Sequence, residues 1–129
     1  MKGFNHVTIR VSDLTASLAF YCGILGMELV HQGRTDAYLE WGAAWICLLE
    51  RKQLQPMPGE EAYGVDHVAL SIENSGFDAA VERLKQAAVP IVRGPIERGG
   101  GRVVNFLDPD GTQLEWNTGS LAGRMKVWN

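Results

Sequence analysis

The amino-acid sequence predicts an α+β protein built from two copies of a βαβββ module, whose strands form a curved mixed sheet. Three observations favour this fold class: an alternating strand pattern occurs twice, a helical pattern follows each copy, and three short strand patterns follow each helix. The two copies begin 61 positions apart, at His6 and His67. One helix cannot enclose a full core with four strands, so we expect two modules, of one chain or of two, to pair.

The first module is expected over residues 1–52. Its first strand reads His6-Val-Thr-Ile-Arg-Val, and Ser12 or Asp13 can cap the helix that follows. Apolar side chains fall near helical spacing from Leu14 to Leu25. Three short strands are then predicted, at 27–32, 36–41 and 44–50.

The second module is expected over residues 65–119, with Asn74 or Ser75 as the helix cap and apolar helical spacing from Phe77 to Ala88. Strands are predicted at 91–93, 102–107 and 112–117, and Asp108-Pro-Asp-Gly111 is typical of a tight turn. The Gly99–Gly101 run is interpreted as a flexible loop over a substrate. Residues 53–64 are predicted to be an exposed linker and residues 120–129 a C-terminal tail.

Composition excludes several classes of protein. The chain of 129 residues has a net charge of −3 and no Lys/Arg block, so nucleic acid is not an expected partner. The longest apolar run, Ala43 to Leu49, is far shorter than the roughly 20 residues that cross a bilayer. The N-terminus lacks the pattern of a secretory signal, and the two cysteines are expected to be reduced, so we expect a cytoplasmic protein.

Strand alternation predicts which side chains share a face with each histidine. In the first strand His6, Thr8 and Arg10 oppose an apolar face, and His67 does the same in the second module. Glu115 opposes the apolar face of the last strand. Two imidazoles and one carboxylate would leave coordination positions open on Fe(II), Mn(II), Zn(II) or Ni(II). The alternative is that both histidines merely end their strands with satisfied hydrogen bonds and that Glu115 is solvated.

The chain resembles the vicinal oxygen chelate superfamily, which includes glyoxalase I, extradiol dioxygenases, bleomycin-binding proteins and fosfomycin-resistance enzymes. The resemblance covers essentially the whole chain and is carried by NHVTIRVSDLTASLAFYCGILGM, AYLEWGAAWICLLE, VDHVALSI and NFLDPDGTQLEW. Within the superfamily the chain is most similar to the fosfomycin-resistance group, through AYLEWGAAWICL and GSLAGR. The resemblance implies a divalent metal ion, Mn or Fe above all, on His6, His67 and Glu115.

The same resemblance implies further site residues. Thr8 and Arg124 would act in catalysis, and the expected substrate-binding residues are Tyr38, Trp45, Arg102 and Asn105. The sequence also departs from the fosfomycin-resistance pattern, because Val103 and Asn105 stand where that group has a serine and a tyrosine, and Pro95 and Gly99 replace a lysine and a serine. Cys47 stands where glyoxalase I has a fourth, carboxylate ligand.

The expected activity is the metal-dependent addition of a thiol or water to a small, acidic, epoxide-like substrate. The expected partners are that substrate, a thiol co-substrate and a second copy of the chain in a homodimer with paired modules. One alternative is an Fe(II) extradiol-type dioxygenase, although that chemistry needs a further His and Tyr in the cleft, and His31 is the only other histidine. A second alternative is a metal-free binding protein like those that confer bleomycin resistance.

Overall fold

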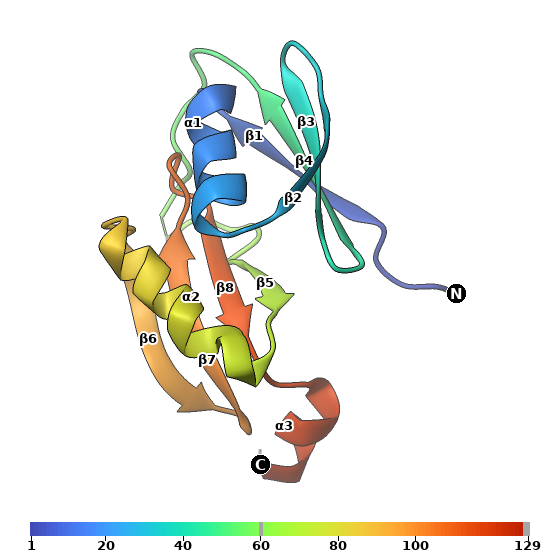
Figure 1. Ribbon diagram of the computed structural model, residues 1–129, viewed down its shortest axis with the longest axis vertical. Helices are drawn as coiled ribbons and strands as arrows, with labels where there is room; N and C mark the ends of the chain where they lie inside the picture. The colour runs from blue at the N-terminus through green and yellow to red at the C-terminus, as the bar shows by residue number, and fades with distance from the viewer. Residues whose placement is uncertain (60, 128–129) are drawn as a thin grey trace. The chain divides into compact units, whose positions relative to one another are not determined.

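The computed structural model describes residues 1–59 and 61–127, and it divides into two compact units, Met1–Met57 and Pro58–Asn129. The division falls within the stretch that the sequence predicts to be a linker. Each unit contains a four-stranded sheet with helices, so the predicted α+β fold of two βαβββ modules is confirmed. Each unit is described below by itself (Figure 1).

The sheet of the first unit has the strand order β1-β4-β3-β2. Strand β1 is parallel to β4, and the other neighbours are antiparallel. A short helix, α1, continues directly into a π-helical segment, η1, whereas the sequence predicts one regular helix. The elements are β1 (His6–Val11), α1 (Leu14–Leu18), η1 (Ala19–Ile24), β2 (Glu28–Gln32), β3 (Asp36–Trp41) and β4 (Ala44–Glu50).

Two acidic side chains accept backbone hydrogen bonds that fix the start of α1. Asp13 is the N-cap, and its side chain accepts a hydrogen bond of 3.1 Å from the backbone N–H of Ala16. Glu50, at the end of β4, accepts one of 2.7 Å from the backbone N–H of Leu14. The apolar side chains of the strands are buried on one face, including those of Val11, Leu39, Ile46 and Leu48. The other face therefore carries the side chains of opposite parity, among them His6 and Thr8.

The second unit repeats this topology with the strand order β5-β8-β7-β6, in which β5 is parallel to β8. Helix α2 covers one face of the sheet (Figure 1), where Phe77 and Leu84 are fully buried. Trp116, Leu114, Phe106 and Val104 complete this core from the strands. The elements are β5 (Val68–Ser71), α2 (Asn74–Gln86), β6 (Ile91–Arg98), β7 (Gly101–Leu107), β8 (Gln113–Asn117) and α3 (Leu121–Val127).

The glycine run between β6 and β7 differs from the sequence prediction. The interpretation of Gly99–Gly101 as a flexible covering loop is wrong, because β6 extends to Arg98 and a two-residue turn joins it to β7. Both turn residues have positive φ, 60° at Gly99 and 81° at Gly100. Two consecutive residues with positive φ suit a two-residue hairpin turn, and glycine reaches that conformation most readily. The glycines therefore close a long hairpin.

Two smaller features complete the fold. The structure places the N-cap of α2 at Glu73, one residue before the predicted caps, and no side-chain hydrogen bond is made there. The Asp108–Gly111 turn forms as predicted, with Gly111 at a φ of 91° and the Asp108 carboxylate accepting from the backbone N–H of Thr112 at 2.8 Å. Within the described ranges, none of the helices has the length and apolar character needed to span a bilayer.

Candidate functional site

His67 and Glu115 meet on the open face of the second sheet, the face opposite α2. His67 directly precedes β5, and the parallel pairing of β5 with β8 aligns Ala69 with Glu115. The His67 Nε2 and Glu115 Oε1 atoms lie 3.5 Å apart. The Glu115 side chain is only 7% exposed and that of His67 is 29% exposed, so the pair is largely shielded from water.

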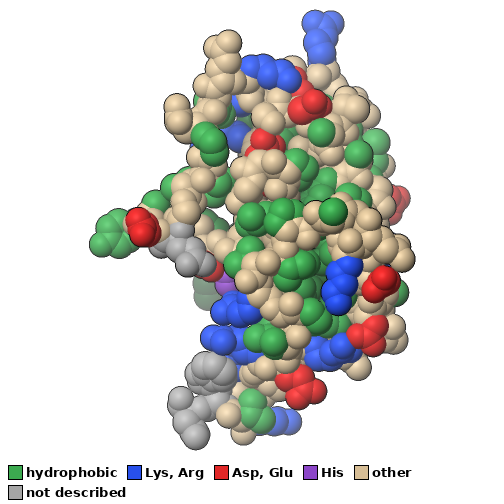
Figure 2. Space-filling model, turned by 90° about the vertical axis from the view of Figure 1, so that its left-hand side faces the viewer, with side chains coloured by type: hydrophobic (Ala, Val, Ile, Leu, Met, Phe, Trp, Pro, Cys, Tyr) green, Lys and Arg blue, Asp and Glu red, His purple; other side chains and the backbone are tan. Residues whose placement is uncertain are grey.

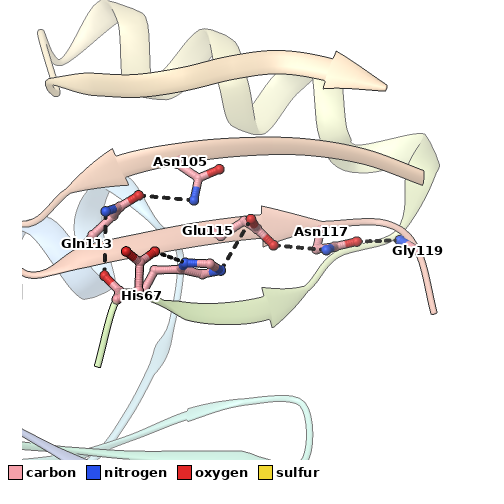
Figure 3. A network of polar contacts seen from close by, with 7 residues as sticks. His67, Asn105, Gln113, Glu115, Asn117 and Gly119 are labelled. Atoms are coloured by element: carbon pink, nitrogen blue, oxygen red, sulfur yellow. Dashed lines mark hydrogen bonds and ion pairs between the residues drawn. The ribbon is translucent and has the colours of Figure 1, made fainter. Parts of the chain in front are cut away.

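Neighbouring polar groups hold both side chains in place (Figure 3). Asp66 Oδ2 lies 2.6 Å from His67 Nδ1, and the side-chain amide of Asn117 donates a 2.9 Å hydrogen bond to Glu115 Oε2. The backbone N–H of Gly119 in turn donates to Asn117 Oδ1 at 2.7 Å. Histidines that bind metals commonly have their second ring nitrogen held by a carboxylate in this way.

The proton on the imidazole explains why this pair suits a cation. A carboxylate can only accept, so a neutral His67 donates from Nδ1 to Asp66 and directs the Nε2 lone pair at Glu115. Two acceptors then face each other, and either a proton on Nε2 or a metal ion between the two groups makes this arrangement favourable. Two ligand atoms bound at about 2.1 Å to one ion lie roughly 3.0 to 3.4 Å apart, close to the observed separation. His67 and Glu115 therefore fit a divalent metal ion.

His6 has the same local arrangement in the first unit. Its Nδ1 lies 2.6 Å from the side-chain oxygen of the preceding residue, Asn5, as His67 Nδ1 does from that of Asp66. The His6 ring stacks on the Trp45 indole with 4.3 Å between centroids and 29° between planes. Both contacts orient the ring and leave Nε2 as the nitrogen available for a ligand.

The open face of the first sheet brings together the other predicted residues of that unit. The register pairs His6 with Trp45, and it pairs Thr8 with Cys47, which in turn pairs with Tyr38. Trp45 and Tyr38 are 40% and 37% exposed, and their rings meet edge to face at 6.0 Å. His31 extends this row, with its ring 5.4 Å from that of Tyr38.

A cavity of about 370 Å³ opens on the second unit and contains three of the predicted site residues: His67, Glu115 and Arg124. Arg124 lies in α3, and its side chain rests against the hairpin turn, where a Cβ on Gly99 would lie 3.2 Å from the guanidinium carbon. Two further arginines, Arg93 and Arg98, line the same cavity, and no motif in the sequence marks either of them as a site residue.

Arg102 and Asn105 are not among the residues that line the cavity. Arg102 belongs to the face covered by α2, where its guanidinium pairs with Asp78 and lies 4.4 Å from the centre of the Phe77 ring. Asn105 is fully buried on the opposite parity of β7, and its amide donates to Gln113 at 3.2 Å. Alternation along β7 separates the two residues, and the same rule applied to the sequence would have distinguished them. The substrate-binding roles of Arg102 and Asn105 stay predictions.

The predicted ligand set has members in both units. Within either unit, the described residues contain no group of three His, Cys, Asp or Glu side chains that could hold a metal ion. The second unit supplies the His67 and Glu115 pair, and His6 belongs to the first unit. Metal binding by these three residues is therefore still a prediction, and neither unit alone contains all three ligands.

Comparison with known proteins places these features in a family. The model of the Glyoxalase/Bleomycin resistance protein/Dioxygenase superfamily matches residues 3–116. The chain is 37% identical to the metallothiol transferase FosB of Staphylococcus epidermidis over 125 residues, which cover 96% of this chain and 87% of FosB. It is also 37% identical to the glutathione transferase FosA of Serratia marcescens, with 97% of this chain and 86% of FosA covered.

Solved structures show the same fold. The fosfomycin resistance protein FosX of Listeria monocytogenes superimposes with a TM-score of 0.79 at 27% identity, covering 99% of both chains. A glyoxalase/dioxygenase from Nostoc punctiforme gives a TM-score of 0.80 at 27% identity, covering 92% of both chains. The chain therefore belongs to the glyoxalase/bleomycin resistance/dioxygenase superfamily, the vicinal oxygen chelate proteins, with fosfomycin resistance proteins among its relatives.

Proposed function

We propose that the chain is a divalent-metal-dependent enzyme that adds a thiol or water to a small, acidic, epoxide-like substrate. The observation that carries the proposal is the facing of His67 Nε2 and Glu115 Oε1 at 3.5 Å, each held by a further hydrogen bond. With His6 these groups supply two imidazoles and a carboxylate, a set suited to Mn(II) or Fe(II) with positions left open.

The relatives support this class of reaction. FosB is named a metallothiol transferase and FosA a glutathione transferase. FosX of Listeria monocytogenes was solved with Mn(II) and sulfate, and a single-substitution variant of it was solved with Mn(II) and 1S,2S-dihydroxypropylphosphonic acid. We therefore propose Mn(II) or Fe(II) as the metal ion, and a small thiol as co-substrate with water as the alternative nucleophile.

Each site residue has a defined task in the proposed addition. The sulfur or water oxygen forms a bond to one epoxide carbon, that carbon's bond to oxygen breaks, and the nucleophile's proton ends on the released oxygen. A bound divalent ion would stabilise the negative charge that develops on this oxygen. Thr8 directs its hydroxyl onto the open face and would orient the attacked carbon, and Arg124 would hold the acidic group.

The proposed partner is a second copy of the chain. A three-ligand site needs both units, and these come from one chain or from two. Mixing His6→Ala chains with Glu115→Ala chains distinguishes these cases. In a homodimer whose sites combine His6 of one chain with the pair of the other, each mixed dimer regains one intact site and binds Mn(II) again. Sites built within one chain would gain no Mn(II) binding from mixing.

Turnover tests the activity directly. Metal-free protein is reloaded with Mn(II) or Fe(II) and incubated with epoxides that carry a phosphonate or a carboxylate, with glutathione or with water alone. Mass spectrometry should detect the adduct or the diol with the metal-loaded protein, and not with Glu115→Ala protein. Oxygen consumption with a catechol on the iron-loaded protein would replace this proposal by the extradiol dioxygenase alternative.

A further inference from the structure

The two oxygens of the Glu115 carboxylate have different neighbours. Oε1 lies 3.5 Å from His67 Nε2, whereas Oε2 accepts a 2.9 Å hydrogen bond from the side-chain amide of Asn117 (Figure 3). The Glu115 side chain is only 7% exposed, so water has little access to either oxygen. One oxygen of this carboxylate therefore faces the imidazole with which it would share a metal ion, and the other is already occupied.

A backbone N–H fixes the direction of the Asn117 amide. The N–H of Gly119 donates a 2.7 Å hydrogen bond to Asn117 Oδ1. Because a backbone N–H can only donate, the carbonyl end of this amide must face Gly119 and its NH2 end must face Glu115. Asn117 therefore offers Glu115 a donor and not an acceptor.

The backbone around Asn117 leaves this amide little freedom. Asn117 pairs with Ser71 on β5 and with Val103 on β7, so strands flank it on both sides. The next contact is equally close, because a Cβ on Gly101 would lie 2.7 Å from the backbone nitrogen of Gly119. Only glycine at position 101 leaves room for this approach. A rigid frame therefore holds the donor against Glu115 Oε2.

Carboxylate ligands are scarce in the cavity of the second unit. Glu115 is the only acidic residue among the described residues that line it. Figure 2 shows Lys and Arg side chains (blue) close to the visible histidine (purple) on one face. The number of Glu115 oxygens that are free therefore decides how many carboxylate oxygens a cation finds in this cavity.

Divalent ions differ in how they use a carboxylate. Small transition-metal ions such as Zn(II) bind one carboxylate oxygen at about 2.0–2.2 Å. Ca(II) forms longer bonds of about 2.3–2.6 Å, takes roughly six to eight oxygen ligands and often binds both oxygens of one carboxylate. To reach the second oxygen of Glu115, Ca(II) would have to displace the amide of Asn117.

We propose that Asn117 is a positioning residue that makes Glu115 a ligand through one oxygen, and that it thereby favours small transition-metal ions over Ca(II). Asn117 acts through Glu115, because its NH2 group occupies Oε2 and leaves Oε1 facing His67. The proposal deepens the proposed function, on which the assignment of Glu115 to metal binding rests.

Binding of Mn(II) and of Ca(II) to metal-free protein tests the proposal without turnover. Competition with a chelator measures the affinity for Mn(II), and amide NMR shifts in a titration with millimolar Ca(II) measure the affinity for Ca(II). In Asn117→Ala we expect the affinity for Ca(II) to rise about tenfold, because Ca(II) no longer displaces a hydrogen bond to a charged group. The affinity for Mn(II) should fall about tenfold, because a ligand loses the partner that orients it.

Thr118→Val is the matched control on the same segment. The Thr118 hydroxyl accepts a 2.9 Å hydrogen bond from the backbone N–H of Arg102, and no hydrogen bond joins it to Glu115 among the described residues. This variant loosens the segment and leaves the Asn117 amide in place, so both affinities should stay within about twofold of wild type. Thermal unfolding of each metal-free variant checks that the comparison is made on folded protein.

The outcomes separate this proposal from the proposed function. A rise in Ca(II) affinity that Mn(II) does not share, seen in Asn117→Ala and not in Thr118→Val, supports selection by Asn117 even if no epoxide reacts. Asn117→Ala that binds Ca(II) no more tightly than wild type, or that changes both affinities by the same factor, overturns it even if the metal-loaded protein turns over epoxides. An equal change of preference in Thr118→Val overturns it as well.

Discussion

Asp66 is predicted to strengthen metal binding through His67 without contacting the ion. Its carboxylate lies 2.6 Å from His67 Nδ1, and removing such a partner typically lowers metal affinity 10- to 100-fold. Because the Asp66 side chain is 72% exposed, water screens its charge. For Asp66→Ala we therefore expect metal affinity to fall by the lower end of this range, about tenfold or about 1.4 kcal/mol. Asp66→Asn keeps an acceptor and loses the charge, so we expect about threefold.

Competition between the protein and a chelator of known affinity measures these changes for Mn(II). Asp78→Asn is a suitable control, because Asp78 pairs with Arg102 on the face opposite the cavity and is similarly exposed. The order expected is wild type and Asp78→Asn tightest, then Asp66→Asn, then Asp66→Ala. If Asp66→Ala binds Mn(II) within twofold of wild type, the reasoning that Asp66 fixes the tautomer and orientation of His67 is refuted.

Two further predictions concern the core and the partly buried thiol of Cys22. Phe77→Ala removes a fully buried ring and should lower the free energy of unfolding by about 3–5 kcal/mol in urea titrations. The control, Met125→Ala at an exposed position, should change the free energy of unfolding by less than about 0.5 kcal/mol. Equal changes in the two variants would contradict the assignment of Phe77 to the core. Burial raises the pKa of the Cys22 thiol, so at pH 8 a smaller fraction of Cys22 than of a small free thiol is thiolate. In a Cys47→Ser background, iodoacetamide should therefore label Cys22 more slowly than it labels the free thiol. The labelling rate should continue to rise at pH values where the free thiol has levelled off, and matching pH profiles would contradict the raised pKa of the partly buried Cys22.

The fold was predictable because its signals are local and repeated. The alternating strands that begin at His6 and His67, the helical spacing that follows each, and the strands at 36–41 and 44–50 all appear in the structure. Three features were not predictable from these signals: the π-helical turn of η1, the full length of β6, and the two-residue hairpin at Gly99 and Gly100. Each depends on backbone geometry or on pairing with another strand, which residue type alone does not determine.

The site was predictable only in part, for a physical reason. His67 and Glu115 were expected to share a face, and the parallel pairing of β5 with β8 brings them together. Arg93 and Arg98 were not singled out because their position at the cavity depends on the cross-strand register of β6, which no local pattern encodes. Arg102, expected at the substrate, lies on the α2 face beside Asp78, and its substrate-binding role stays a prediction.

The account depends on one cation held jointly by His6, His67 and Glu115. Equilibrium dialysis of Mn(II) against wild-type protein and the three single alanine variants tests this most directly. We predict one tightly bound ion per chain in the wild type and a loss of affinity of at least about a hundredfold in each variant, because each loses one of three ligands. A His6→Ala variant that retains wild-type affinity, or wild-type protein that takes up no Mn(II), would contradict the account.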